Sequence, residues 1–365
     1  MDRRSQPRSS EVLSIQYLRA LAALLVVFHH ARQFPGFKDA VGTGIGVSGV
    51  DIFFVISGFV MALTAGRAGY PPLTFLRRRA TRIIPIYWVV TLLAAILPFA
   101  APGVFTENAF TWKHFILSLL FIPHVAPIAP FNYSPLLTVG WTLNFEVFFY
   151  LVFAALMAFR LSARIVTMTI LFSTLIVIDT LWHPDFTPLR FWADGQLFEF
   201  VMGCVIGWLY ANGHLARIPV PLAWLGIVGA SVAFAIFGAN SPDIPRVILF
   251  GIPAAMMVAG AVCLDQHGRI EFSAAWKFLG DASYSIYLVH LMVIIVVAKI
   301  WTMAGMPVEG LANAIIFMSI AMAIGTLGGI ATYLCIERPI LNFFRQRRGP
   351  PPRSPSLVAG FQDVT

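Results

Sequence analysis

Ten apolar stretches of about twenty residues run through this chain, and they constrain its fold more than any other feature. A helix of about 20 apolar residues is the length that spans the hydrocarbon core of a bilayer. Of the 365 residues, 58% are hydrophobic and 12% charged, too little charge for an ordinary soluble domain. We predict an all-α polytopic membrane protein, a bundle of about ten transmembrane helices, and we exclude a soluble enzyme, a disordered chain and a nucleic-acid-binding module. The predicted spans are residues 12–31, 45–64, 82–100, 138–159, 163–181, 191–210, 220–237, 246–264, 278–300 and 311–336.

The 25 basic residues predict the orientation of these spans. With the N-terminus in the cytoplasm, 19 of them fall on the cytoplasmic side and 6 on the outer side. Lys and Arg gather in cytoplasmic loops, so both termini are predicted to be cytoplasmic. Residues 1–344 are expected to form one membrane domain, and the basic, Pro-rich residues 345–365 a disordered cytoplasmic tail. The short apolar stretch 112–122 is predicted to be interfacial or re-entrant.

The first span carries Arg19 and His30 on one helix face. Eleven residues separate them, three helical turns plus about 20°, and about 16 Å along the axis. A phosphate-binding group and a general base arranged in this way suit an elongated substrate that has an anionic end and a reacting end. Each ionisable group at the centre of a span costs about 2.5–3.5 kcal/mol, so such groups mark functional sites or hydrogen bonds that tie helices together. The alternative for His30 is an imidazole that snorkels to the interface.

Two carboxylates are predicted in the outer half of the membrane together with His30. Asp51 could orient the imidazole or pair with a positive partner. Glu146 lies between Thr142 and Tyr150 on one face of the fourth span, and a partly desolvated carboxylate there could transfer protons.

Small residues accompany two other polar residues. Ser57 precedes Gly58 near mid-membrane, where a ligand or a second helix could approach closely. Glu199 is followed on the same face by Gly203 and Gly207, a spacing typical of tight helix packing with one polar contact.

Basic and hydroxyl side chains predict a binding surface for the substrate. Arg79 and Arg82 share a face at the entry to the third span, and guanidinium groups bind phosphates bidentately. The alternative is membrane anchoring by positive charge alone. Ser283, Tyr287 and His290 form a polar stripe on the ninth span. No His or carboxylate pair has the spacing of metal ligands on one span, so we expect no metal site.

Six segments, in order along the chain, resemble the acyltransferase 3 family of integral membrane O-acyltransferases, which modify bacterial cell-surface polysaccharides. The first and fourth are most similar to its exopolysaccharide O-acetyltransferase branch. The segments are SIQYLRALA at 14–22 running on to His30, GVDIFFVISGF at 49–59, RATRIIPIYW at 79–88, GWTLNFEVFFY at 140–150, ASYSIYLVH at 282–290 and ERP at 337–339.

The resemblance implies acetyl-CoA or another acyl-CoA as donor and a sugar hydroxyl of an exported polysaccharide or its lipid-linked precursor as acceptor. It implies that His30 and Arg19 are the residues most needed, and that Arg79 and Arg82 help hold the donor. It also implies a multi-pass protein of the bacterial inner membrane. His30 is expected to act as general base, oriented by Glu146 or Asp51, or else to carry the acyl group transiently.

The alternative function is a transporter or flippase of lipid-linked sugars, since such proteins also bury ionisable groups. Against it, the sequence shows no inverted repeat and no pair of broken spans.

Overall fold

The computed structural model describes residues 12–34, 44–102, 104, 110–127, 133–237 and 244–346, and this part of the chain is helical without strands. Most of the predicted tail, residues 347–365, lies outside it. The helices are α1 Leu13–Arg32, α2 Ser48–Ala65, α3 Pro72–Ala100, α4 Trp112–Leu119, α5 Trp141–Ala155, α6 Leu161–Trp182, α7 Thr187–Trp192, α8 Leu197–Ala211, α9 Val220–Phe237, α10 Ile252–Gln266, α11 Ala274–Met303, α12 Leu311–Thr332 and α13 Arg338–Gln346.

The all-α membrane fold is confirmed. In the described part of the chain, nine helices are long and apolar enough to cross a membrane. The remaining predicted span, the sixth at residues 191–210, is divided between the short helix α7 and the 15-residue helix α8. The predicted non-spanning stretch 112–122 contains α4, an eight-residue helix.

Helix α3 begins ten residues before the predicted start of its span. Its first residue, Pro72, suits that position because proline lacks the backbone N–H that a helix start leaves unpaired. The basic run 77–82 breaks the apolar pattern, so hydropathy alone placed the boundary too late. Arg79 and Arg82 therefore lie inside a helix, which aims both side chains into the bundle, and not in a loop.

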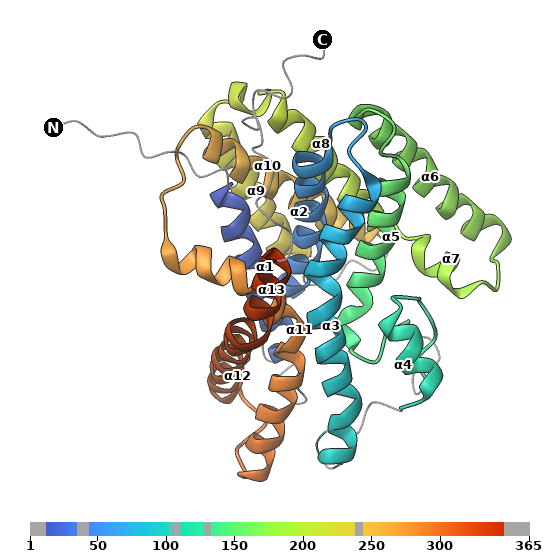
Figure 1. Cartoon of the computed structure of the whole chain (residues 1–365). Helices are drawn as coiled ribbons and strands as arrows, with labels where there is room; N and C mark the ends of the chain where they lie inside the picture. The colour runs from blue at the N-terminus through green and yellow to red at the C-terminus, as the bar shows by residue number, and fades with distance from the viewer. Residues whose placement is uncertain are drawn as a thin grey trace.

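Close backbone contacts hold the centre of the bundle together (Figure 1). A Cβ atom at Gly58 of α2 would lie 1.9 Å from the carbonyl oxygen of Phe200 in α8, and one at Gly203 would lie 2.0 Å from that of Val55. The predicted role of the glycines in tight packing is confirmed. A second crossing joins α1 and α11, where a Cβ at Gly280 would lie 2.2 Å from the carbonyl oxygen of Gln16.

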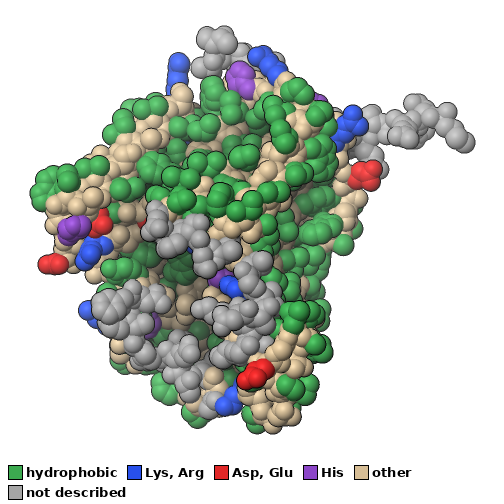
Figure 2. All heavy atoms as spheres, turned by 180° about the vertical axis from the view of Figure 1, so that it is seen from behind, with side chains coloured by type: hydrophobic (Ala, Val, Ile, Leu, Met, Phe, Trp, Pro, Cys, Tyr) green, Lys and Arg blue, Asp and Glu red, His purple; other side chains and the backbone are tan. Residues whose placement is uncertain are grey.

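The outer surface of the bundle suits a bilayer. Hydrophobic side chains cover most of the face seen in Figure 2, and basic side chains stand at its upper end. Helices α6, α9 and α12 expose large apolar residues along their length, among them Ile170, Leu225 and Leu327. Apolar side chains so exposed are stable in lipid and would be costly in water.

Candidate functional site

A cavity of about 430 Å³ lies inside the bundle, between α1, α2, α3, α5 and α11. One part of its wall is apolar and comes mainly from α1 and α2, including Ile15, Phe59 and Val60. The other part carries most of the polar residues singled out on these helices, without His30, Asp51 and His290. Those that line it are Arg19, Ser57, Arg79, Arg82, Thr142, Glu146, Tyr150, Ser283 and Tyr287.

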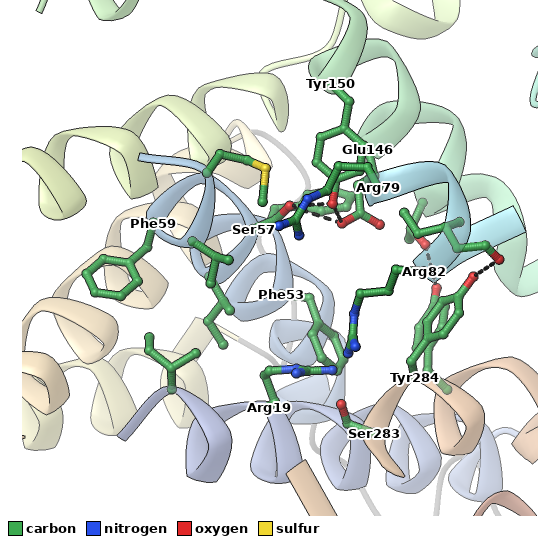
Figure 3. Close-up of a pocket in the computed structure, with 18 of the residues that line it drawn as sticks. Arg19, Phe53, Ser57, Phe59, Arg79, Arg82, Glu146, Tyr150, Ser283 and Tyr284 are labelled. Atoms are coloured by element: carbon green, nitrogen blue, oxygen red, sulfur yellow. Dashed lines mark hydrogen bonds between the residues drawn. The ribbon is translucent and has the colours of Figure 1, made fainter. Parts of the chain in front are cut away.

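Three arginines reach this cavity from two helices. Arg19 comes from α1, and Arg79 and Arg82 from α3; Figure 3 shows the side chains of Arg19 and Arg82 pointing toward each other. Arg19 donates a long hydrogen bond of 3.4 Å to Gln16 Oε1. In the described residues, no salt bridge within 4.0 Å joins these three guanidinium groups to a carboxylate. Three cations in a largely apolar cavity form a site for an anion with several negative charges.

Glu146 is the one acidic residue among the described residues that line the cavity, and two hydroxyl groups hold it (Figure 3). Ser57 donates a hydrogen bond of 3.0 Å to Glu146 Oε1, and the Tyr150 hydroxyl donates to the same oxygen. The Ser57 and Tyr150 oxygens are 3.2 Å apart. One carboxylate oxygen is therefore fixed, which orients the second.

Helix α11 supplies a further part of the cavity wall, with Ser283, Tyr284 and Tyr287. The hydroxyl of Ser283 is buried and has no hydrogen-bond partner among the described residues. Tyr284 donates to the Ile83 carbonyl oxygen at 3.0 Å. Tyr287 donates to the Val139 carbonyl oxygen at 2.7 Å, and its hydroxyl lies 2.8 Å from that of Thr142.

His30 lies beyond this wall and does not line the cavity. The ring of Tyr287 contacts Phe53 on the cavity side and His290 on the other, with centroid distances of 5.9 Å in both pairs. His290 Nε2 is 3.1 Å from His30 Nδ1. The predicted stripe Ser283–Tyr287–His290 is therefore one face of α11, and it leads from the cavity to His30.

Neither carboxylate that was expected to orient His30 is bonded to it in the structure. Glu146 is held by Ser57 and Tyr150, and Asp51 pairs with Arg246. Arg246 donates to both carboxylate oxygens of Asp51, at 3.0 and 2.8 Å. The alternative expectation for Asp51, a positive partner, is the one the structure shows.

Glu199 is fully buried beside Asp51, and the two carboxyl groups lie within hydrogen-bonding reach of each other. Its Cγ atom would lie 2.9 Å from a Cβ at Gly251. Glu199 thus makes a contact between α8 and the α10 region, as expected for a helix-packing position, and it lies outside the cavity.

Sequence reasoning gave no functional role to three residues near the site. Arg246 was counted only as an outer-side charge. Tyr284 lies between two selected residues of the same stripe. Glu337, which entered the sequence analysis only as part of the ERP segment, accepts a 2.5 Å hydrogen bond from Ser285 and lies near enough to Arg19 and Arg82 to attract both. Its place in a single turn of π-helix, residues Tyr333–Glu337, is a signal that the sequence does not carry.

The chain resembles known proteins over most of its length. The acyltransferase domain family matches residues 12–334. Exopolysaccharide production protein ExoZ of Rhizobium meliloti is 35% identical over 313 residues, which cover 83% of this chain and 92% of that protein. Acyltransferase MdmB of Streptomyces mycarofaciens is 27% identical, over 94% of this chain and 95% of its own length.

A third relative, O-acetyltransferase OatA of Staphylococcus aureus, is 25% identical over 84% of this chain and 56% of its own length. No solved structure matches. The family match spans every residue of the cavity and the His30–His290 pair. This chain therefore belongs to the acyltransferase 3 family and is a membrane acyltransferase.

Proposed function

We propose that this protein transfers an acyl group, most simply acetyl, from acyl-CoA to a hydroxyl of an exported polysaccharide or its lipid-linked precursor. The observation that carries the proposal is the convergence of Arg19, Arg79 and Arg82 on one cavity beside a single carboxylate. The names of two relatives, an exopolysaccharide production protein and an O-acetyltransferase, support the acceptor class and the acyl group.

The charge balance of the cavity supports a CoA thioester as the donor. A coenzyme A molecule carries phosphates at one end and the thioester at the end of a long arm. Charge-assisted hydrogen bonds from guanidinium groups hold phosphates, and the apolar wall with Ile15 and Phe59 accommodates the uncharged parts. Arg19 and His30 lie about 16 Å apart along α1, and the arm of a donor held by its phosphates must pass the wall formed by Tyr287 before the thioester reaches His30.

The reaction proceeds by attack of the acceptor hydroxyl on the thioester carbonyl. His30 Nε2 takes the hydroxyl proton as the new C–O bond forms. The C–S bond then breaks, and the proton passes to the CoA sulfur. Glu146, which accepts hydrogen bonds from Ser57 and Tyr150, keeps the part of the cavity that binds the donor in a fixed geometry. The alternative route forms an acyl-His30 intermediate first, which rapid quenching and mass spectrometry of the protein would detect.

The proposed setting is the bacterial inner membrane, with both termini in the cytoplasm. In this orientation Val12 and Ile15, which line the cavity at the start of α1, lie on the side where acyl-CoA is made. His30, near the end of α1, lies toward the outer side. The acyl group then crosses the bilayer within the bundle, and no free anionic donor has to pass through lipid.

The test is release of free thiol from acetyl-CoA by detergent-purified protein, with and without a crude bacterial polysaccharide. We expect release that polysaccharide stimulates and that Arg19→Gln greatly reduces. Folded protein that neither releases thiol nor binds CoA would contradict the donor assignment. It would return the flippase alternative to consideration.

A further inference from the structure

His30 and His290 form an imidazole pair in which His290 is buried and His30 half-buried, and the hydrogen bonds that the pair makes to other described residues go to backbone carbonyl groups. His290 Nδ1 lies 2.7 Å from the Tyr287 carbonyl oxygen and 3.2 Å from that of Ile286. His290 Nε2 lies 3.1 Å from His30 Nδ1, which is also 3.0 Å from the Val26 carbonyl oxygen. The His290 side chain is 0% exposed. Its hydrogen bonds must therefore come from these neighbours.

These contacts determine which ring nitrogens carry protons. A carbonyl oxygen only accepts, so His290 Nδ1, which faces two of them, must be the N–H of a neutral ring. His290 Nε2 then carries a lone pair and accepts. His30 Nδ1 thus faces two acceptors, His290 Nε2 and the Val26 oxygen, and must be an N–H in turn. The second nitrogen of His30, Nε2, is left with its lone pair.

We propose that His290 is a positioning residue that fixes His30 in the tautomer with a proton on Nδ1 and a free lone pair on Nε2. This inference rests on the proposed role of His30 as general base, and it takes the place that Glu146 and Asp51 were expected to fill. A base held in the wrong tautomer presents an N–H to the acceptor hydroxyl and cannot take its proton.

The same contact acts on the protonated base. When His30 Nε2 has taken the proton, the ring is an imidazolium that needs an acceptor at Nδ1, and His290 Nε2 remains there. His290 is itself anchored to α11 by the Tyr287 and Ile286 carbonyl groups, so the acceptor is fixed before the reaction begins. Pre-organisation of this kind lowers the barrier without strengthening donor binding.

Two substitutions separate positioning from packing. In His290→Gln, the side-chain oxygen can occupy the place of Nε2 and accept from His30. In His290→Asn, the shorter amide can keep a bond to the Tyr287 carbonyl oxygen but does not reach His30. We expect His290→Asn to lower kcat by about 10–100-fold with the KM for acetyl-CoA unchanged, as for partners that orient a functional side chain. His290→Gln is expected to recover most of that loss.

A double-mutant cycle with His30→Ala excludes a purely structural effect. If His290 acts through His30, adding His290→Asn to His30→Ala costs nothing more. Equal turnover of His290→Asn and wild type would overturn the positioning role. So would a His290→Asn substitution that lowers turnover by the same factor in the His30→Ala protein as in the wild type. Normal turnover of His30→Ala would instead refute the proposed base itself. Melting temperature and elution volume in detergent identify any variant that has failed to fold, and His290→Leu then supplies a second variant without an acceptor.

Discussion

The crossing of α2 and α8 allows a prediction from distances alone. In Gly58→Ala, the new Cβ would lie 1.9 Å from the Phe200 carbonyl oxygen, whereas ordinary contacts begin at 3.4 Å. The two helices must therefore separate by about 1.5 Å. Ser57 is the preceding residue, and its 3.0 Å hydrogen bond to Glu146 does not survive a displacement of that size.

We expect Gly58→Ala to lower turnover about 100-fold, because a displacement of about 1 Å at a reacting site has that effect. The free energy of unfolding should fall by about 1–3 kcal/mol, the usual cost of overpacking. The assay is thiol release from acetyl-CoA, with melting temperature measured in the same detergent. The matched control is Gly226→Ala on α9, whose new Cβ would lie 3.5 Å from the Met256 carbonyl oxygen. Wild-type turnover in Gly58→Ala would refute the argument.

Three further predictions follow from single contacts. Arg82→Gln should raise the KM for acetyl-CoA about 10–100-fold, because one charge-assisted hydrogen bond contributes about 1.5–3 kcal/mol. An unchanged KM would show that Arg82 does not bind the donor. Arg246→Leu should lower the free energy of unfolding by about 3–5 kcal/mol, since it leaves Asp51 buried without its partner, and melting of this variant beside Arg246→Leu/Asp51→Leu checks this. His114 Nδ1 in α4 lies 2.6 Å from His124 Nε2. Burial of His114, and to a smaller extent the neighbouring imidazole, lowers the pKa of His114 to about 4. The unfolded chain then binds more protons below pH 6.5, so the packing of α4 should weaken as pH falls from about 6.5 toward 4; hydrogen exchange should show this in wild type and less in His124→Gln.

Much of the bundle could be predicted from the sequence because lipid imposes a simple rule on composition. Helix positions followed from apolar length, and the helical period predicted the shared face of Thr142, Glu146 and Tyr150, which lines the cavity. The start of α3 could not be found in this way, since Arg77 to Arg82 belong to a helix although they are basic.

The partners of the polar residues depended on contacts between distant segments. His30 and His290 are separated by 260 positions, and Asp51 and Arg246 by 195. Helical periodicity gives the face on which a residue lies but not which helix packs against that face. Asp51 and Glu146 were therefore predicted to serve His30 and yet are bonded to other residues.

Transfer of isotope-labelled acetyl from acetyl-CoA to polysaccharide, followed by mass spectrometry of the product, tests the central claim most directly. The comparison is between wild type, His30→Ala and His29→Ala. His29 is the adjacent imidazole on α1, and it contacts Gln33 and not His290. We predict labelled ester with wild type and His29→Ala and about 10²–10⁴-fold less with His30→Ala, the loss expected when a general base is removed. Equal labelling by His30→Ala and wild type would contradict the account.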